Sequence, residues 1–340
     1  SRMDAPVMHP TRRGSKAKAA AAIRSADPEA LVQELIDDRY AASGVASVAS
    51  LIRGWARFHH LAHRHLDDPP PVYPITADSL VRVGSIFKKG GYRSFANYLS
   101  AAKTRHVEGP PPEEWTPLLD HTGRWVSKSV SRGIGPARQS CSFHFQRLCK
   151  LGRQAAPLVV GGPMQPMHLA LLSSLFLLRE VESGTAVASS WSFDHADLEL
   201  TWNLPGAKAD PMALGTSRTW GCLCDLPEFA CPYHLAVEHF GWLQRHPLYR
   251  NGAFPLFPTE CGNHAPKAKV VETFELLGTL LGQPLASPDG LRLFGGHTAR
   301  VTGAQTFAAA GLEVNKIRIL ARHSGDTILR YCRLYTFPVP

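Results

Sequence analysis

Four side chains near the end of the chain have the chemistry needed to hold and cut a phosphodiester. His297 and Arg300 are three residues apart, and His323 and Tyr331 follow in the segment GGHTARVTGAQTFAAAGLEVNKIRILARHSGDTILRY. Residues at i and i+3 share one face of a helix, so His297 and Arg300 can reach the same phosphate oxygens. A guanidinium binds a phosphate bidentately, and a phenol can form a covalent intermediate. This combination predicts phosphodiester cleavage by a tyrosine.

Helices and a small sheet must position these groups. From residue 297 onward the pattern is almost wholly helical, with Gly311 ending one helix and 313–321 forming the next. Upstream, the apolar run 167–182 predicts one helix, and 189–204 alternates apolar and polar residues as antiparallel strands do. Helical patterns return at about 232–244 and 270–281. Residues 156–340 are therefore expected to form one mixed α and β domain.

The preceding part of the chain, residues 25–155, has the patterns of an all-helical domain. Asp27 can cap a helix that starts at Pro28 and continues to about residue 40. The later helices are separated by proline-rich breaks, which lie at 67–74 and 109–115. Residues 1–24 have low complexity and no apolar period, which predicts a flexible basic arm.

The charge of the chain is unevenly distributed. The 340 residues carry a net charge of +9, yet residues 122–153 contain no acidic side chain and residues 291–340 carry seven basic against two acidic ones. One-sided runs of this kind suit a phosphate backbone, so double-stranded DNA is the expected partner. The side chains expected to contact DNA in the helical domain are Arg93, Lys103, Arg124, Lys128, Arg132 and Arg138.

The sequence also bears on the compartment. It has no apolar run of eighteen residues and no secretory signal, which argues against a membrane-spanning or secreted protein. Seven cysteines, an odd number, indicate reduced thiols, so we expect an intracellular protein located with DNA, in the nucleus or in the bacterial cytoplasm. The chain starts at Ser1, as a piece of a longer reading frame would.

The order of the chemistry-bearing residues resembles that of the tyrosine recombinases, the phage-integrase family. These enzymes share an arginine at the end of an early helix of the catalytic domain, a lysine on a β-hairpin, an HxxR motif, a later His or Trp, and a tyrosine nucleophile. In this sequence the matching positions are Arg179 in LLREVE, with Glu182 in the R-x-x-E pattern, Lys208, His297, Arg300, His323 and Tyr331. The resemblance covers roughly residues 25–335 and is strongest at the C-terminal end.

The resemblance implies a mostly α fold with a small antiparallel sheet, in which a helical core-binding domain closes over DNA beside a mixed α+β catalytic domain. It implies a 3′-phosphotyrosyl intermediate, no catalytic cofactor, a homotetramer on two duplexes and an origin in a mobile element. In this assignment the transition-state charge is held by Arg179, Arg300 and His323, and Lys208 protonates the departing 5′ oxygen. His297 supports the phosphate and accepts the tyrosine proton, while Glu182 buttresses the arginines.

Two points stay open. Tyr331 follows His323 at an interval of only eight positions, which makes Tyr335 a second candidate nucleophile, although a helical pattern through Ile328 and Leu329 favours Tyr331. The biological task also has alternatives. A type IB topoisomerase would cut and reseal a single strand with the same groups, and a DNA-binding protein with a decayed active site would keep the fold alone.

A second group of residues has the chemistry of metal ligands. Cys222, Cys224, Cys231 and His234 lie within thirteen residues and can form a tetrahedral Cys₃His zinc site that pins the hairpin to the next helix. The C-x-C spacing is tighter than usual, and free cysteines are also common as small apolar residues. The alternative ligands are Cys261 and His264. Such a zinc ion would be structural and would take no part in strand cleavage.

Overall fold

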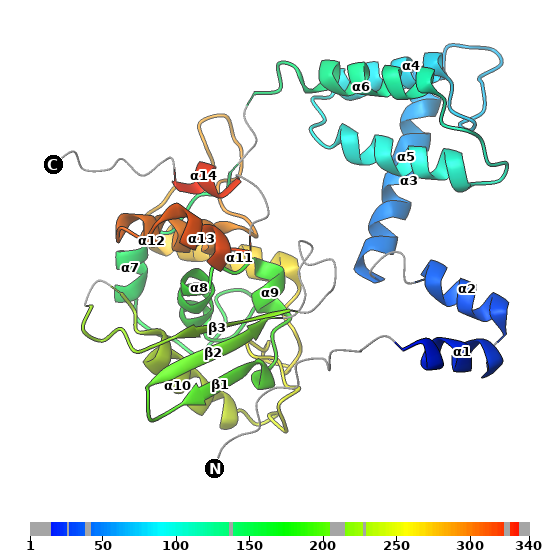
Figure 1. Cartoon of the computed structure of the whole chain (residues 1–340). Helices are drawn as coiled ribbons and strands as arrows, with labels where there is room; N and C mark the ends of the chain where they lie inside the picture. Colours follow the sequence, from blue (N-terminus) through cyan, green and yellow to red (C-terminus); the bar gives the residue numbers. More distant parts are fainter. Residues whose placement is uncertain are drawn as a thin grey trace. The chain divides into compact units, whose positions relative to one another are not determined.

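A computed structural model describes residues 15–25, 27–37, 42–135, 139–204, 215–226, 229–322 and 327–332 (Figure 1). The chain divides into two compact units, one formed by Arg12–Arg138 and the other containing Gln139–Pro340. In the described residues the first unit is helical and the second contains helices with a single three-stranded sheet. This confirms the predicted fold class.

The helices of the N-terminal unit are α1 Lys16–Ser25, α2 Pro28–Asp37, α3 Ala42–His63, α4 Ala77–Lys89, α5 Phe95–Glu108 and α6 Pro117–Ser131. Helices α3 to α6 pack around Trp55, Leu80, Phe87 and Phe95, which are all buried. Helix α1 lies where the sequence predicted a flexible arm. Its sequence, KAKAAAAIRS, is rich in alanine, the strongest helix former. Residues 1–14 of that arm lie outside the described residues.

The C-terminal unit is built around a buried central helix. Its helices are α7 Phe145–Lys150, α8 Pro166–Leu175, α9 Glu180–Gly184, the 3₁₀ turn Ala188–Ser190, α10 Pro232–Gln244, α11 Lys267–Leu280, α12 Thr298–Ala309, α13 Val314–Leu320 and α14 Thr327–Cys332. Every residue of α8 is buried, and Figure 1 shows the sheet on one side of it and α12 on the other. The mostly apolar sequence of α8, in which the polar residues are His168, Ser173 and Ser174, suits this central place.

The sheet follows α9 along the chain and confirms the predicted antiparallel strands. Strands β1 Trp191–Asp194, β2 Glu199–Leu204 and β3 Thr216–Trp220 pair in the order β1-β2-β3, and both pairs are antiparallel. The buried residues of β2 alternate along the strand, which places Trp202 and Leu204 against the core.

One predicted helix, 167–182, is two helices in the structure. α8 ends at Leu175, Leu177 has a left-handed φ of 50°, and α9 begins at Glu180. Three backbone carbonyls at this break accept hydrogen bonds from side chains. Trp220 Nε1 donates to Leu175 at 3.1 Å, Arg218 Nη1 to Phe176 at 2.7 Å and Arg300 Nε to Leu177 at 2.8 Å. The break persists because tertiary donors satisfy carbonyls that a continuous helix would have bonded internally.

The boundary between the units also differs from the predicted one at 155/156. Residues 139–155 belong to the C-terminal unit, where Phe143, Phe145 and Leu148 are buried in its core. The amide of Cys141 donates to the carbonyl of Leu293 at 2.7 Å. These apolar anchors place the boundary at the segment that precedes residue 139.

No helix in the part of the chain that the structure describes is long and apolar enough to cross a membrane.

Candidate active site

A single buried carboxylate gathers three arginines. Glu182, the third residue of α9, accepts a hydrogen bond from Arg300 Nη2 at 2.6 Å on Oε2 and from Arg179 Nη2 at 3.2 Å on Oε1. Arg322 Nη2 also donates to Oε1. The Glu182 side chain is 6% exposed and that of Arg300 is 5% exposed, so this ion pair is shielded from water. Three cations around one anion leave an excess of positive charge that a phosphate can neutralise.

Backbone amides at the start of α9 orient this cluster. The amide of Arg179 donates to Glu182 Oε2 at 2.7 Å, which is how an acid at the third position closes the start of a helix. The amide of Glu180 donates to the carbonyl of Gly296 at 3.0 Å and so joins α9 to the loop before α12. A Cβ at Gly296 would lie 2.0 Å from the Glu180 carboxyl carbon, so a larger residue at position 296 would require the Glu180 side chain to move.

His297 and Tyr331 meet beside the arginine cluster. His297 caps α12, and its Nδ1 lies 3.3 Å from the Tyr331 hydroxyl. Arg300 follows in the first turn of α12 and contacts Glu182. Tyr331 lies on α14 and is 6% exposed. The structure thus places the predicted nucleophile next to a group that can accept its proton.

The electrostatics of the site fit this arrangement. Burial opposes ionisation of Glu182, but Arg300, the Arg179 amide and Arg322 outweigh it and lower the pKa of Glu182 to about 2. Burial and the neighbouring Arg300 lower the pKa of His297 below its ordinary value. Burial raises the pKa of Tyr331, and Arg300 opposes that rise. At neutral pH the phenol is therefore protonated, and His297 is a neutral base.

Several predicted site residues lie outside the described residues. Lys208 belongs to the segment 205–214 that joins β2 to β3, and His323 and Tyr335 belong to 323–326 and 333–340. The antiparallel pairing of β2 with β3 fits the expected hairpin around Lys208. The catalytic roles of these residues stay predictions.

Two arginines of this region were not predicted from the sequence. Arg322 contacts Glu182, and its adjacency to His323 was the only available signal. Arg218, on β3, is 7% exposed, bonds to the Phe176 carbonyl, and has its pKa lowered to about 9 by burial and by Arg322 and Arg300. The single arginine among the threonine, serine and tryptophan of β3 carries no periodic signal that marks it.

The four predicted metal ligands converge. The donor atoms of Cys222, Cys224, Cys231 and His234 lie within 4.8 Å of one another. Burial opposes ionisation of Cys231, but the backbone amides of His234 and Leu223 outweigh it and lower its pKa to about 6. The alternative ligand His264 instead bonds to the Gly184 carbonyl through Nδ1 at 3.0 Å, and Cys261 is an exposed thiol.

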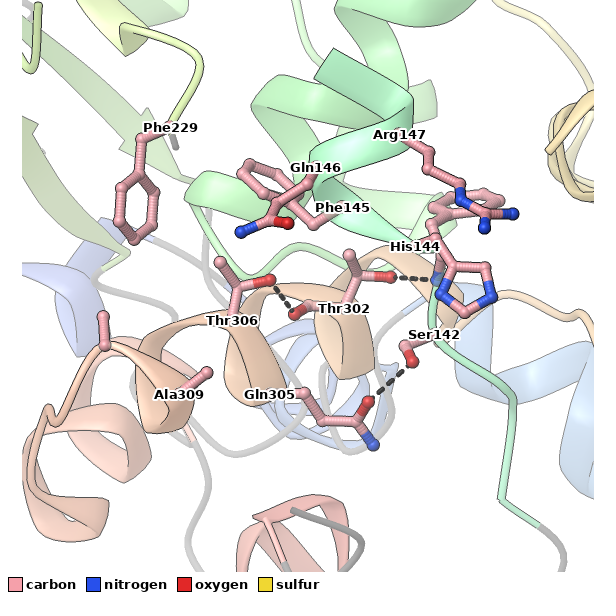
Figure 2. Close-up of a pocket in the computed structure, with 12 residues that line it drawn as sticks. Ser142, His144, Phe145, Gln146, Arg147, Phe229, Thr302, Gln305, Thr306 and Ala309 are labelled. Carbon is pink, nitrogen blue, oxygen red and sulfur yellow. Dashed lines mark hydrogen bonds between the residues drawn. The ribbon is translucent and has the colours of Figure 1, made fainter. Parts of the chain in front are cut away.

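A cavity of about 520 Å³ lies between α7 and α12 (Figure 2). Phe145 and Phe229 form part of its wall, and Thr302, Gln305 and Thr306 contribute the polar face of α12. Gln305 accepts a hydrogen bond from Ser142 at 2.6 Å and donates to the Tyr331 carbonyl at 3.2 Å. Helix α12 therefore connects the cavity wall to the helix that carries the phenol.

The predicted DNA contacts of the N-terminal unit divide into two groups. Arg93 donates to the carbonyls of Gly135 and Ile134, and Lys103 lies over the Trp115 ring at 4.9 Å, so both are engaged within the unit. Three residues spaced by four along and just after α6 are exposed, namely Arg124, Lys128 and Arg132. Of these, Arg124 also forms an ion pair within the unit, with Asp120 Oδ2 3.4 Å from its Nη1. Arg138 lies outside the described residues. All six stay predictions as DNA contacts.

Comparison of the whole structure with solved structures identifies the fold. The chain has the fold of the tyrosine recombinases, which confirms the predicted resemblance at the level of the fold. No protein-family model matches the sequence. No curated protein matches it in sequence either.

Three solved structures illustrate the likeness. The integrase of transposon Tn1549 in complex with circular intermediate DNA is 13% identical, with a TM-score of 0.55 over 90% of this chain and 94% of that one. A lambda integrase dimer bound to a COC' core site is 11% identical, with a TM-score of 0.55 over 97% and 85% of the two chains. The XerH site-specific recombinase bound to difH is 11% identical, with a TM-score of 0.54 over 96% and 89%.

Proposed function

We propose that this chain is a site-specific DNA recombinase or integrase that cuts and rejoins double-stranded DNA through a 3′-phosphotyrosyl intermediate. The observation that carries the proposal is the phenol of Tyr331 placed 3.3 Å from His297 Nδ1, beside arginines gathered on Glu182. The DNA complexes of similar structures support a duplex DNA substrate, and the likeness to a transposon integrase supports a mobile element as its origin.

In the proposed reaction, Tyr331 Oη attacks the phosphorus and transfers its proton to His297. The P–O bond to the tyrosine forms as the P–O bond to the 5′ oxygen breaks. The phosphoryl charge is held by Arg179, Arg300 and His323, and Lys208 donates a proton to the departing oxygen. Because one phosphodiester replaces another, the bond energy is conserved and rejoining needs no cofactor. Glu182 keeps the guanidinium groups of Arg179, Arg300 and Arg322 in place and takes no proton.

The remaining parts of the proposal concern the assembly. The N-terminal unit would contact the phosphate backbone through the exposed basic side chains Arg124, Lys128 and Arg132, in a homotetramer that holds two duplexes. The protein would act in the compartment that contains its DNA. The Cys₃His group would hold a structural zinc ion with no role in bond cleavage.

Trapping on nicked DNA tests this function. A pool of duplexes with random sequence around a nick lets the cleaved fragment diffuse away, which leaves the covalent complex unable to reseal. We expect wild type to form a covalent complex and Tyr331→Phe to form none while still binding DNA. If the wild-type protein forms no covalent complex with any duplex of the pool, the result would instead favour a DNA-binding module with a decayed active site.

A second assay separates recombinase from topoisomerase. Sequences recovered from the trapped complexes are placed in two copies on one supercoiled plasmid. We expect exchange between the copies, seen as excised or inverted segments. Relaxation of supercoils without exchange would assign the chain to single-strand cutting and resealing of the type IB kind.

A further inference from the structure

We propose that Cys222, Cys224, Cys231 and His234 bind one zinc ion, and that this ion fixes the end of β3 to the start of α10 and so supports helix α12. The support would reach the active site through α12, which carries Arg300 and bonds to the Tyr331 carbonyl. The metal content stands independently of the proposed recombinase function, whereas the supporting role rests on it.

The distances between the donor atoms fit a tetrahedral site. With Zn–S near 2.3 Å and Zn–N near 2.05 Å, tetrahedral geometry puts two sulfurs about 3.8 Å apart and a sulfur and a nitrogen about 3.6 Å apart. The Sγ atoms of Cys222 and Cys231 are 3.6 Å apart. His234 Nδ1 lies 3.6, 3.2 and 3.2 Å from the sulfurs of Cys222, Cys224 and Cys231. Small movements of the side chains would complete the coordination.

The donor set points to zinc. Three thiols and one imidazole are ligands that suit zinc and that calcium and magnesium do not take. A disulfide would need sulfurs about 2.05 Å apart, far closer than the 3.6 Å between Cys222 and Cys231. The amide of Leu223 donates to Cys231 Sγ at 3.3 Å, a bond that favours a thiolate.

The ligands come from the end of one element and the start of the next. Cys222 and Cys224 follow the end of β3, Cys231 caps α10, and His234 lies in the first turn of α10. One ion would therefore fix the end of β3 to the start of α10. Cys224 and His234 are exposed, so a metal can reach the site without opening the core.

Aromatic side chains on both sides of the loop rest on α12. Trp220 stacks on Phe307 with centroids 5.2 Å apart, and Phe229 stacks on the same ring at 6.4 Å. The indole of Trp220 also donates to the Leu175 carbonyl at the break after α8. Loss of the ion would break the link between the end of β3 and the start of α10. The contacts of Trp220 and Phe229 with Phe307 would then weaken.

Helix α12 transmits that support to the active site. Arg300 lies two turns before Phe307 on this helix, and Gln305 donates to the Tyr331 carbonyl at 3.2 Å. Figure 2 shows Phe229 facing the end of α12 near Ala309, with Gln305 on the same helix. A shift of α12 would therefore move both the phosphate-binding guanidinium and the phenol.

The experiment measures bound metal first. The full chain is purified with a tag that contains no histidine, and its zinc content is compared with those of Cys224→Ser and the matched control Cys261→Ser. We expect one zinc per chain in wild type and in Cys261→Ser, and at least a fivefold loss in Cys224→Ser. Replacement of zinc by Co²⁺ should give the absorption of tetrahedral thiolate coordination in wild type. Equal metal content in Cys224→Ser and wild type, or no metal in wild type, would overturn the site.

The supporting role is tested on the same samples. Removing zinc from wild type with a chelator should lower the melting temperature and slow covalent trapping at least tenfold, and returning zinc should restore both. Cys224→His, which keeps a ligand at this position, should retain metal even if Cys224→Ser does not fold. Unchanged trapping by metal-free protein would refute the support of α12. A wild-type protein that binds zinc but never forms the covalent complex with DNA would refute the recombinase function without contradicting the metal site.

Discussion

The hydroxyl of Tyr331 lies 3.3 Å from Nδ1 of His297, although α12 and α13 separate the two residues along the chain. The imidazole lies at the start of α12 and the phenol on α14, so the packing of α12 against α14 brings the proposed nucleophile to the proposed base. Because burial and Arg300 lower the pKa of His297, the imidazole is neutral at physiological pH and can take the phenol proton.

Glu182→Gln should destabilise the protein and impair cleavage. The amide has no charge to balance Arg300, whose side chain is 5% exposed, and an unpaired buried charge costs about 3–5 kcal/mol. Urea unfolding measures the loss of free energy. The matched control is Glu272→Gln, which removes an exposed ion pair with Lys269 and should cost under about 1 kcal/mol. Equal costs for both variants would show that Glu182 is not the organiser of the arginines.

Arg322→Gly should separate folding from cleavage. Arg322 has a left-handed φ of 50°, where glycine removes a backbone strain of about 1 kcal/mol, which partly offsets the lost bond to Glu182. We expect a folded protein whose trapping rate falls about tenfold or more, because the cluster loses one of its cations. Lys316→Met, at an exposed site on α13, is the control and should trap at the wild-type rate. An unchanged rate in Arg322→Gly would remove Arg322 from the functional cluster.

Gly303→Ala tests the close contact between α8 and α12. A Cβ at residue 303 would lie 1.9 Å from the Ser174 carbonyl oxygen, so one helix backbone must move. Overpacking of this kind costs about 1–3 kcal/mol, and we expect a lower melting temperature with slower trapping. Gly152→Ala is the control, since nothing lies within 4 Å of its added methyl. A Gly303→Ala protein as stable as the control would mean that the two helices are less closely packed.

Acidification should destabilise the protein through a buried histidine pair. His239 Nε2 donates to the Leu256 carbonyl at 2.7 Å, so its Nδ1 accepts from His168 Nδ1 at 3.2 Å, and both rings are neutral. Burial and its partner His239 lower the pKa of His168 to about 3, and burial lowers that of His239 to about 4.

The sign of the pH effect follows from proton binding. Below the unfolded pKa of about 6.5, the unfolded chain binds protons that the folded protein does not bind. The free energy of unfolding therefore has its full value above that pH and falls as the pH drops toward the folded pKa values. The loss is about 2 kcal/mol per histidine by about pH 5. Urea unfolding from pH 7.5 to 5 measures it. His239→Gln keeps a donor and an acceptor and should flatten the dependence; an identical slope would contradict the assignment.

The sequence selected a set of residues that the structure brings together, but it did not predict their geometry, and their catalytic roles stay predictions. The order of Arg179, Glu182, His297, Arg300 and Tyr331 was sufficient to select them, and the structure brings these five together. The contact of Arg322 with Glu182 was missed because it joins residues 140 positions apart, and no local period encodes such a contact.

The fold was predicted where periodicity is strong. Helices α3 and α10 and strands β1 and β2 lie where their patterns placed them, because one face of each packs against a core. The break at Leu177 was missed because its flanking residues are uniformly apolar. The side-chain donors that stabilise it lie on β3 and α12, which are distant parts of the chain.

The measurement that tests the central claim most directly is the identity of the residue that carries the DNA. Covalent complexes trapped on nicked duplexes are digested with nuclease and protease, and the peptide that bears the remaining nucleotide is sequenced by mass spectrometry. We predict a phosphotyrosyl link at Tyr331, absent from Tyr331→Phe and present in Tyr335→Phe. A nucleotide attached to Tyr335 or to any other residue would contradict the assignment of the nucleophile.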